Sequence, residues 1–356
     1  MNKYLDELKK KITIVNKKNL IKKKKLAFFI SNTAKVKDVP FYFTPIRETK
    51  NFYYFGIILF DDFLIKKICK IIDGKFDSIF VDAEKKSYST RKKNYLINIE
   101  RSVKENVQKS YLKFYKANDI TVNAAENFLQ HQYIKDKRNL GGKKILIIGA
   151  GNIGFKLSLR LVERGSNVEI YRRDTKKLHR ICELINFIKP AGTMSNVKPF
   201  KFFKKKLNQF DIIICCAKGI NIIKLKNYNE LKKNVILLDI GKGMFDKNTL
   251  KNLTKNNFKI YRLDVSSSLD MEVENSEIFK LIKNKKYNIR KVSKYTLVSN
   301  GLLGQKNDLI VDDVFNPKIL FGVSDGEGDF KDTSRREKNF IINKIYKYIN
   351  KKIDFN

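Results

Sequence analysis

Residues 143–154 decide the fold, and they read Lys143-Lys-Ile-Leu-Ile-Ile-Gly149-Ala-Gly151-Asn-Ile-Gly154. The continuous apolar run at 144–148 predicts a strand that is buried on both faces, as in a parallel sheet. The pattern after the glycines predicts a helix over 155–164, and a second strand follows at 167–171. This order of strand, glycine turn, helix and strand is typical of a doubly wound parallel sheet in an α/β protein.

The three spaced glycines also predict a binding site for a dinucleotide. Gly149 allows the tight turn, Gly151 lets backbone N–H groups approach a pyrophosphate, and Gly154 lets the helix pack closely on the strand. The positive end of the helix dipole favours a diphosphate at this place. We therefore expect a Rossmann domain that binds NADP or NAD. The alternative is a glycine turn that binds nothing.

The end of the second strand selects between the two coenzymes, and it reads Ile170-Tyr171-Arg172-Arg173-Asp174. NAD sites usually carry an acidic residue here for the ribose hydroxyls, but Arg172 stands in its place. Guanidinium groups can bind the 2′-phosphate of NADP through charge-assisted hydrogen bonds. The sequence thus predicts NADP. Two alternatives stay open: Asp174 could reach the ribose, or both arginines could be ordinary surface residues.

Two further strand ends are expected at the same crevice. Residues 211–219 end in Ala217-Lys218-Gly219, whose small residues would let a nicotinamide ribose approach the backbone. Residues 237–243 contain Asp239 and Gly241, and Asp239 is either functional or a cap for the next loop. The complete set of expected cofactor-binding residues is Gly149, Ala150, Gly151, Asn152, Ile153, Gly154, Arg172, Arg173, Asp174, Ala217, Lys218, Gly219 and Gly241.

The chain has 356 residues, which is enough for two domains and a terminal extension. We expect an N-terminal α/β substrate domain at 1–138, a Rossmann domain at 139–324, and a linker with an amphipathic helix at 325–356. That last helix, at 338–353, is expected to pack back on the body of the protein, and membrane-surface binding is the minor alternative.

Periodicity predicts the remaining elements. In the N-terminal domain, Asn123 and Glu126 have the spacing of a capping box near the start of the second of two predicted helices. Strands are expected there at 26–30, 41–44, 52–59 and 78–81, and helices at 61–72, 95–115 and 121–135. Further strands of the Rossmann domain are expected at 211–215, 235–240, 258–263 and 295–298.

The composition is strongly basic, with 75 Lys and Arg against 37 Asp and Glu, a formal charge of +38. Such a charge attracts polyanions and anionic membranes. The lysines are spread along the chain, however, and Lys, Asn and Ile are all abundant, as codon bias of an AT-rich genome would produce. No specific nucleic-acid partner is therefore expected, although an RNA- or membrane-associated protein stays open on the charge alone.

The cysteines and the apolar runs indicate the compartment. Cys69, Cys182, Cys215 and Cys216 form no CxxC pair, so neither a zinc site nor a disulfide framework is predicted, and no metal is expected. No apolar run approaches the ~20 residues that span a bilayer, and the lysines in residues 1–25 exclude a signal-peptide core. A cytoplasmic protein with reduced thiols is expected.

From residue 121 to about residue 243 the chain resembles the NADP domain shared by shikimate dehydrogenase, glutamyl-tRNA reductase and methylenetetrahydrofolate dehydrogenase. Thr121-Val-Asn-Ala-Ala-Glu opens a helix that leads through Leu140-Gly-Gly-Lys-Lys to the glycine turn. Arg173 matches the phosphate-binding arginine of shikimate dehydrogenase-like proteins, which carry Asn-Arg-Thr there. Cys216-Ala-Lys-Gly219 resembles their Ser-Ala-Thr-Gly loop, and residues 235–241 are similar to the Val-Ile-Asp-Val-Gly strand of the folate enzymes. The resemblance implies the superfamily and does not identify the member.

The chain departs from these families at their catalytic positions. Aligned on Phe128-Leu129, it has Ala124 where shikimate dehydrogenase has the aspartate of its Lys–Asp pair, so that pair is not carried over. Glutamyl-tRNA reductase needs a nucleophilic cysteine, but Cys69 lies on an apolar helical stretch and is interpreted as a buried hydrophobic residue.

The function expected from these patterns is an NADP-dependent oxidoreductase, a dehydrogenase or reductase that acts on a small polar substrate, including carboxylated ones. The alternative is a sensor or assembly module that binds NAD(P) without turnover. His131 and His179 are interpreted as packing or surface residues. The candidates for proton transfer are Lys50, Asp82 and Lys85, which follow strands of the N-terminal domain. The substrate and the direction of reaction stay open, as does a homodimer.

Overall fold

The computed structural model describes residues 2–33, 39–60, 63–85, 88, 95–201, 207–217, 222–223, 225, 228–285 and 288–350. Its contacts divide the chain into two compact units, Met1–Met271 and Glu272–Asn356. Among the described residues, the first unit contains two sheets and the second contains one. The division therefore differs from the expected Rossmann domain at 139–324, because residues 272–324 fold with the C-terminal segment.

The first sheet lies in the segment for which an N-terminal α/β domain is expected. Its strands run in the order β2-β4-β1-β5-β6, with β3 also paired to β4. Strands β1, β4, β5 and β6 are parallel, whereas β2 and β3 are antiparallel to β4. The strands are β1 (Lys25–Asn32), β2 (Phe41–Phe43), β3 (Arg47–Glu48), β4 (Phe52–Leu59), β5 (Ser78–Asp82) and β6 (Tyr111–Tyr115).

Three helices share the core of this sheet: α1 (Asn2–Lys22), α2 (Ile65–Ile72) and α3 (Ile99–Lys104). The lysine-rich sequence of α1 did not lead to a helix prediction. Leu5, Leu8, Ile12 and Val15 nevertheless recur at helical spacing and are buried in the core. The lysines of α1 thus interrupt the sequence without interrupting the apolar face.

The helix predicted over 95–115 is wrong, because this segment forms the short helix α3 and then the edge strand β6. The Asp73 carboxylate accepts backbone N–H groups of Gln108, Lys109 and Ser110 at 2.9–3.3 Å, which fixes the turn between the two elements. β6 then pairs in parallel with β5. These contacts are distant in sequence and override the local helical pattern.

The second sheet of the first unit has the order β12-β11-β10-β7-β8-β9, and all of its described pairs are parallel. Counted from β7, this order is 3-2-1-4-5-6, the strand order of a Rossmann domain. The predicted doubly wound sheet is therefore confirmed. Its strands are β7 (Lys144–Ile148), β8 (Asn167–Tyr171), β9 (Val197–Pro199), β10 (Ile212–Cys215), β11 (Ile236–Asp239) and β12 (Ile260–Arg262).

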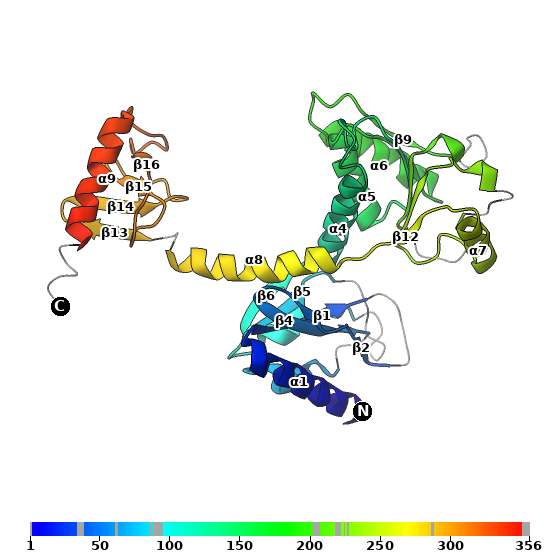
Figure 1. The fold of residues 1–356 in the computed structure, drawn as a ribbon, viewed down its shortest axis with the longest axis horizontal. Helices are drawn as coiled ribbons and strands as arrows, with labels where there is room; N and C mark the ends of the chain where they lie inside the picture. Colours follow the sequence, from blue (N-terminus) through cyan, green and yellow to red (C-terminus); the bar gives the residue numbers. More distant parts are fainter. Residues whose placement is uncertain are drawn as a thin grey trace. The chain divides into compact units, whose positions relative to one another are not determined.

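Helix α4 (Ala117–Gln132) begins after β6 and packs beside α5 (Asn152–Glu163) in the Rossmann core (Figure 1). It starts before the expected capping box at Asn123, so that prediction is wrong. Glu126 instead is buried and accepts hydrogen bonds from Arg160 and Arg164 of α5. A buried carboxylate needs such partners, and these fix the two helices side by side.

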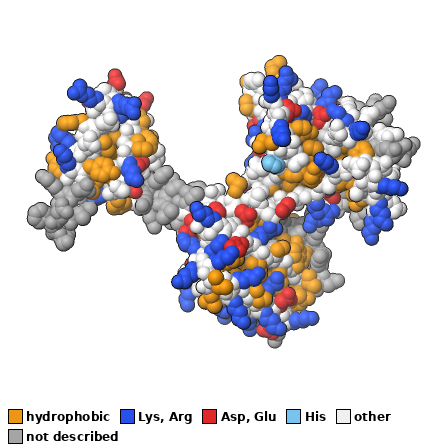
Figure 2. Space-filling model, viewed as in Figure 1, with side chains coloured by type: hydrophobic (Ala, Val, Ile, Leu, Met, Phe, Trp, Pro, Cys, Tyr) orange, Lys and Arg blue, Asp and Glu red, His pale blue; other side chains and the backbone are white. Residues whose placement is uncertain are grey.

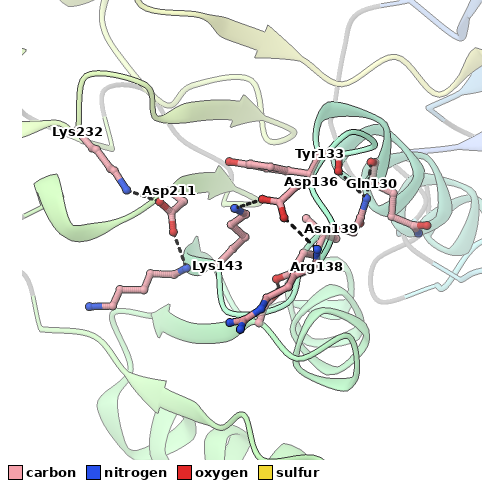
Figure 3. Close-up of polar contacts among 11 residues, drawn as sticks. Gln130, Tyr133, Asp136, Arg138, Asn139, Lys143, Asp211 and Lys232 are labelled. Carbon is pink, nitrogen blue, oxygen red and sulfur yellow. Dashed lines mark hydrogen bonds and ion pairs between the residues drawn. The ribbon is translucent and has the colours of Figure 1, made fainter.

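The connection from α4 to β7 is held by a polar network at the amino-terminal edge of the Rossmann sheet (Figure 3). Asn139 Nδ2 donates to the carbonyl oxygens of Gln130 and Tyr133 at 2.9 and 3.0 Å, which satisfies carbonyls at the end of α4. Lys143 Nζ pairs with Asp136 at 2.6 Å just before the strand. Side chains thus fix the entry to the glycine turn.

The second unit is a four-stranded sheet in the order β13-β14-β15-β16 with α9 (Arg335–Asn350) on it. Within it, Ile345 of α9 is buried against the sheet, so the amphipathic C-terminal helix packs on this unit. The strand expected at 295–298 exists as β14, but in the described residues it pairs with β13 and β15, not with the Rossmann sheet. The strands are β13 (Ile289–Val292), β14 (Tyr295–Ser299), β15 (Leu309–Val311) and β16 (Leu320–Val323).

The surface charge is dispersed. On the face that Figure 2 shows, Lys and Arg side chains lie over all parts of the described surface, interspersed with acidic and hydrophobic ones. This distribution agrees with the interpretation of the lysines as a general feature of the composition. Among the described helices, none is long and apolar enough to cross a membrane.

Candidate functional site

The glycine turn between β7 and α5 has the geometry that the sequence predicted. Gly149 has φ +102°, in the region that favours glycine, and a Cβ there would lie 2.7 Å from the backbone nitrogen of Ala217. A Cβ on Gly154 would lie 1.9 Å from the carbonyl oxygen of Gly149. The first glycine thus permits the bend and the third permits the close packing of helix on turn.

The amino end of α5 presents backbone donors at this turn. The N–H of Phe155 donates to the Gly151 carbonyl at 2.8 Å and closes the first turn of the helix, so the preceding N–H groups have no acceptor within it. A Cβ on Gly151 would have nothing within 4 Å, which leaves open space beside the backbone. Exposed N–H groups with a helix dipole behind them suit a phosphate group.

A cavity of about 590 Å³ lies at the end of β8. Arg172 lines it and donates from Nη1 to the carbonyl oxygen of Ala150 at 2.6 Å. Arg173 also lines it and is exposed. The remaining lining residues are Ile148, Gly149, Ala150, Gly151, Tyr171, Asp174, Ala217 and Ile222. The structure therefore brings together the glycine turn and the basic strand end, as predicted.

The carboxylate of Asp174 is engaged at the start of α6 (Thr175–Ile188). It accepts the backbone N–H of Lys177 at 3.0 Å as the N-cap of the helix, and Lys177 Nζ lies 3.9 Å away. An N-cap aspartate is oriented toward its own helix. The acidic group that would favour NAD is thus held by the protein backbone.

The floor of the site lies where β7 meets β10, at the point at which the strand order reverses. Backbone N–H groups of Cys216 and Ala217 donate to the Ile148 carbonyl at 2.8 and 3.0 Å. A Cβ on Gly241 would lie 1.9 Å from the Ala217 carbonyl, so this glycine is required by close packing. Lys218 and Gly219, which were also expected here, lie outside the described residues.

Asp239 has the capping role that the sequence left open. Its buried carboxylate accepts the backbone N–H groups of Lys242 at 2.9 Å and Gly243 at 3.1 Å, and Arg262 lies 3.5 Å away. Burial raises the pKa of the Cys216 thiol, so this thiol stays protonated at neutral pH. Burial also raises the pKa of Cys69 to about 12, which agrees with a buried hydrophobic role.

Two more cavities involve residues of the N-terminal sheet, and one of them reaches the glycine turn. One of about 540 Å³ extends from Gly149, Gly151 and Cys216 to Asn32 and Thr121. The other, of about 380 Å³, is lined by aromatic residues and also includes Asn32 and Thr121. We call the second one the aromatic cavity. Its lining residues are Phe29, Ser31, Asn32, Thr33, Tyr42, Phe43, Thr44, Pro45, Arg47, Tyr54, Ile58, Tyr115, Ala117, Ile120, Thr121, Val265 and Leu269.

Sequence reasoning missed the polar residues of the aromatic cavity. Ser31 and Asn32 directly follow the apolar run of β1, and Tyr115 ends β6. Polar residues after buried strands are a signal that could have pointed to the carboxyl edge of this sheet. The Ser31 and Tyr115 hydroxyls are hydrogen-bonded to each other in the cavity.

The three residues expected to transfer protons are not brought together. The placement of Lys50 at the crevice is wrong, because it precedes β4 and lies at the amino-terminal edge of the sheet, beside the start of β1. Asp82 is buried and accepts backbone N–H groups of Glu84 at 3.1 Å and Ala117 at 3.4 Å, which holds the start of α4. Lys85 is exposed and lines none of the described cavities.

The histidines are surface residues, and no metal centre is visible in the described part of the chain. His131 and His179 are both exposed, which agrees with their interpretation as packing or surface residues. Among the described residues no group of three or more His, Cys, Asp or Glu side chains is arranged to hold an ion.

Comparisons with known proteins cover the region around this site. The family model of shikimate / quinate 5-dehydrogenase matches residues 132–244. A glutamyl-tRNA reductase from Thermosipho melanesiensis is 25% identical over 115 residues, 32% of this chain and 29% of that protein. A glycerol-3-phosphate dehydrogenase [NAD(P)+] from Clostridium botulinum is 32% identical over 108 residues, 28% of this chain and 32% of that protein. The chain thus spans about a third of the length of these curated relatives.

Among solved structures, one similar chain is shikimate 5-dehydrogenase from Listeria monocytogenes in complex with shikimate and NAD. It is 13% identical with a TM-score of 0.37, over 74% of this chain and 92% of that one.

Proposed function

Because residues 132–244 belong to the NAD(P)-binding Rossmann superfamily, we propose that the chain is an NADP-dependent oxidoreductase. It would transfer a hydride to or from a small polar substrate, and carboxylated compounds are included in this class. The observation that carries the proposal is a single cavity lined by both the glycine turn and the paired arginines at the end of β8.

The residues around the turn fit a dinucleotide. The unpaired N–H groups at the start of α5 would hold the pyrophosphate, since they have no acceptor within the helix. The space beside Gly151 leaves room for that contact. When bound, the nicotinamide ring would supply the hydride chemistry, and the protein would position the substrate carbon and exclude water.

The preference for NADP over NAD rests on three neighbouring residues. Asp174 accepts the Lys177 N–H as the N-cap of α6, so one of its carboxylate oxygens is directed to its own helix and not to the ribose hydroxyls. Arg172 is oriented by its bond to Ala150, and Arg173 is exposed at the cavity. The 2′-phosphate would therefore meet two guanidinium groups and the positive end of α6.

Fluorescence titration of the full chain with NADPH and NADH tests the proposal. We expect saturable binding with a lower dissociation constant for NADPH. A chain that binds neither coenzyme would contradict the proposal. Incubation of the NADPH complex with aldehydes, ketones and oxo acids then separates an enzyme from a module that binds without turnover, because only an enzyme oxidises NADPH.

A further inference from the structure

The aromatic cavity has walls suited to an apolar group. The rings of Phe29 and Tyr54 lie 5.3 Å apart and those of Phe29 and Tyr115 lie 5.4 Å apart, measured between centroids. Tyr54 and Tyr115 line the cavity with their mostly buried rings. A cavity of about 380 Å³ in which aromatic rings lie beside hydroxyl, amide and guanidinium groups is typical of a site for a small organic molecule.

The guanidinium group of Arg47 lines this cavity, and several of its N–H donors are not used by the described residues. Arg47, at the start of β3, is half-buried and donates to the Ser266 hydroxyl. Within the described part of the chain it makes no ion pair. A guanidinium group has five N–H donors in a planar fork, so most remain available for a bidentate carboxylate.

Two carboxylates that interact with residues of this cavity, Asp264 and Asp270, have other partners. Asp264 accepts the backbone N–H of Ser266 at 2.9 Å and the Ser266 hydroxyl, and these bonds together with the charge of Arg47 lower its pKa. Asp270 accepts the Tyr54 hydroxyl at 2.6 Å. Asp264 thus holds the start of α8 (Ser266–Lys285) and Asp270 links that helix to β4, and among the described residues neither forms an ion pair with Arg47.

One acceptor in the cavity has no donor among the residues that the structure describes. Asn32, at the end of β1, is 6% exposed, and its Nδ2 donates to the Glu84 carbonyl at 3.2 Å. Its Oδ1 is buried and unpartnered among the described residues. Because a buried carbonyl oxygen without a donor is costly, it calls for a hydroxyl or N–H group from a ligand.

Asn32 also marks where the reacting carbon would lie. It lines both the aromatic cavity and the cavity that reaches Gly149, Gly151 and Cys216. A group that donates to Asn32 Oδ1 would therefore stand at the boundary between substrate and nicotinamide.

We propose that the aromatic cavity binds a carboxylic acid with an aryl or similarly large apolar group, whose carboxylate pairs with Arg47 and whose hydroxyl or amino group donates to Asn32 Oδ1. This inference rests on the proposed function, since it assigns the substrate class of the same site. The substrate is a hydroxy acid or an amino acid, since the hydroxyl of the first and the amino group of the second can each donate a hydrogen bond to Asn32 Oδ1.

Isothermal titration of the full chain saturated with NADP⁺ tests the inference, with phenyllactate and phenylalanine as probes. Two matched compounds remove one group each: phenyllactamide lacks the carboxylate, and phenylpropionate lacks the hydroxyl. We expect at least one of the two acids to bind about tenfold to a hundredfold more tightly than phenyllactamide, the range for a charge-assisted hydrogen bond. This comparison needs no variant and does not depend on the folding of one.

Variants assign the contacts. R47Q should remove the advantage of the acids over the amide, and R47K should restore part of it because it keeps the charge without the fork. N32L should weaken the binding of phenyllactate and leave the binding of phenylpropionate unchanged. R101Q, at an exposed arginine of α3, is the matched control and should change neither. Retained affinity for NADPH shows that each variant is folded.

Several results would overturn the inference. One is that phenyllactate and phenyllactamide bind with equal affinity. Another is that R47Q does not change the affinity for the acids. The third is that a chain that binds NADPH binds neither acid. In all of these the coenzyme site stands. Failure of NADPH itself to bind is a different result, and it overturns the proposed function together with this inference.

Discussion

Arg172 Nη1 donates a hydrogen bond of 2.6 Å to the carbonyl oxygen of Ala150, so the end of β8 is tied to the glycine turn by a side chain that lines the cavity between them. This bond orients one guanidinium and leaves its neighbour, Arg173, as the more exposed cation at the same cavity. A phosphate bound there would contact both, but substitution of Arg173 leaves the Arg172–Ala150 bond in place. The two arginines are therefore expected to differ when they are substituted.

R173A should raise the dissociation constant of NADPH by about tenfold to a hundredfold, which corresponds to about 1.5–3 kcal/mol for a lost charge-assisted hydrogen bond. The constant for NADH should change much less, because NADH has no 2′-phosphate. R180A, at an exposed arginine of α6 that lines none of the described cavities, is the control for loss of charge. An equal loss of affinity for the two coenzymes would show that Arg173 does not bind the 2′-phosphate.

D174A should lower the free energy of unfolding by about 0.5–2 kcal/mol because it removes the N-cap of α6. D174N keeps a capping oxygen and should lose less. In neither variant should NADH binding weaken more than NADPH binding. If D174A selectively weakens NADH, the carboxylate reaches the ribose in the complex and the NADP assignment is wrong. Urea denaturation and coenzyme titration together provide the data.

Substitutions of Gly154 and Gly151 are expected to affect different properties, the stability of the fold and the affinity for NADPH. G154A places a Cβ 1.9 Å from the Gly149 carbonyl, so overpacking should cost at least about 1–3 kcal/mol of unfolding free energy. G151A meets nothing within 4 Å, and its φ of −86° suits alanine, so the fold should hardly change. Its Cβ would nevertheless occupy space next to the pyrophosphate, and NADPH should bind about tenfold more weakly or worse. A G151A protein that binds NADPH normally contradicts the placement of the pyrophosphate.

The ion pairs of Glu48 in β3 with Lys22 and Lys24, at and just after the end of α1, predict how stability responds to acid. Hydrogen bonds from Lys22 and Lys24, each 2.7 Å long, lower the pKa of Glu48 to about 2. Since the unfolded value is about 4.3, Glu48 stabilises the fold above that pH and loses its contribution as the pH falls toward 2. The stability difference between the wild type and E48Q should therefore be largest near neutrality and shrink in acid.

The control for this pH series is E7Q, which removes a carboxylate from an exposed position of α1. Measurements at low ionic strength are required, because salt screens exposed pairs. A stability difference between the wild type and E48Q that stays constant from neutral pH to acid pH would mean that the Glu48 pairs do not stabilise the fold.

The sequence predicted the Rossmann sheet well because its strands are buried on both faces and read as continuous apolar runs. The predicted bounds of β7 and β8 agree with the structure, and the glycine turn and Arg172 lie where the motif indicated. These features depend on neighbouring residues in the chain, so local patterns were sufficient.

The edge strand β6 and the helix α1 could not be predicted in the same way. β6 exists because it pairs with β5 and because Asp73, more than thirty residues earlier, holds the preceding turn. The segment alone has apolar residues at spacings that also suit a helix. In α1, the apolar face is narrow and is hidden by the lysines between its members.

The aromatic cavity is a tertiary feature, and no local motif marks it. Arg47 meets Ser266 across 219 positions of sequence, and Tyr54 meets Asp270 across 216. Only the return of the chain from β12 into α8 brings them together. The candidates Lys50 and Lys85 were chosen by their proximity to predicted strands, a criterion that does not specify which edge of a sheet a residue occupies.

The most direct test of the central claim is the ratio of the NADH and NADPH dissociation constants for the unmodified chain, measured under one set of conditions. A site formed by the glycine turn, the paired arginines and an Asp174 that caps α6 should bind NADPH more tightly, by a factor of about ten or more. A ratio near unity, or no measurable affinity for either coenzyme, would contradict it.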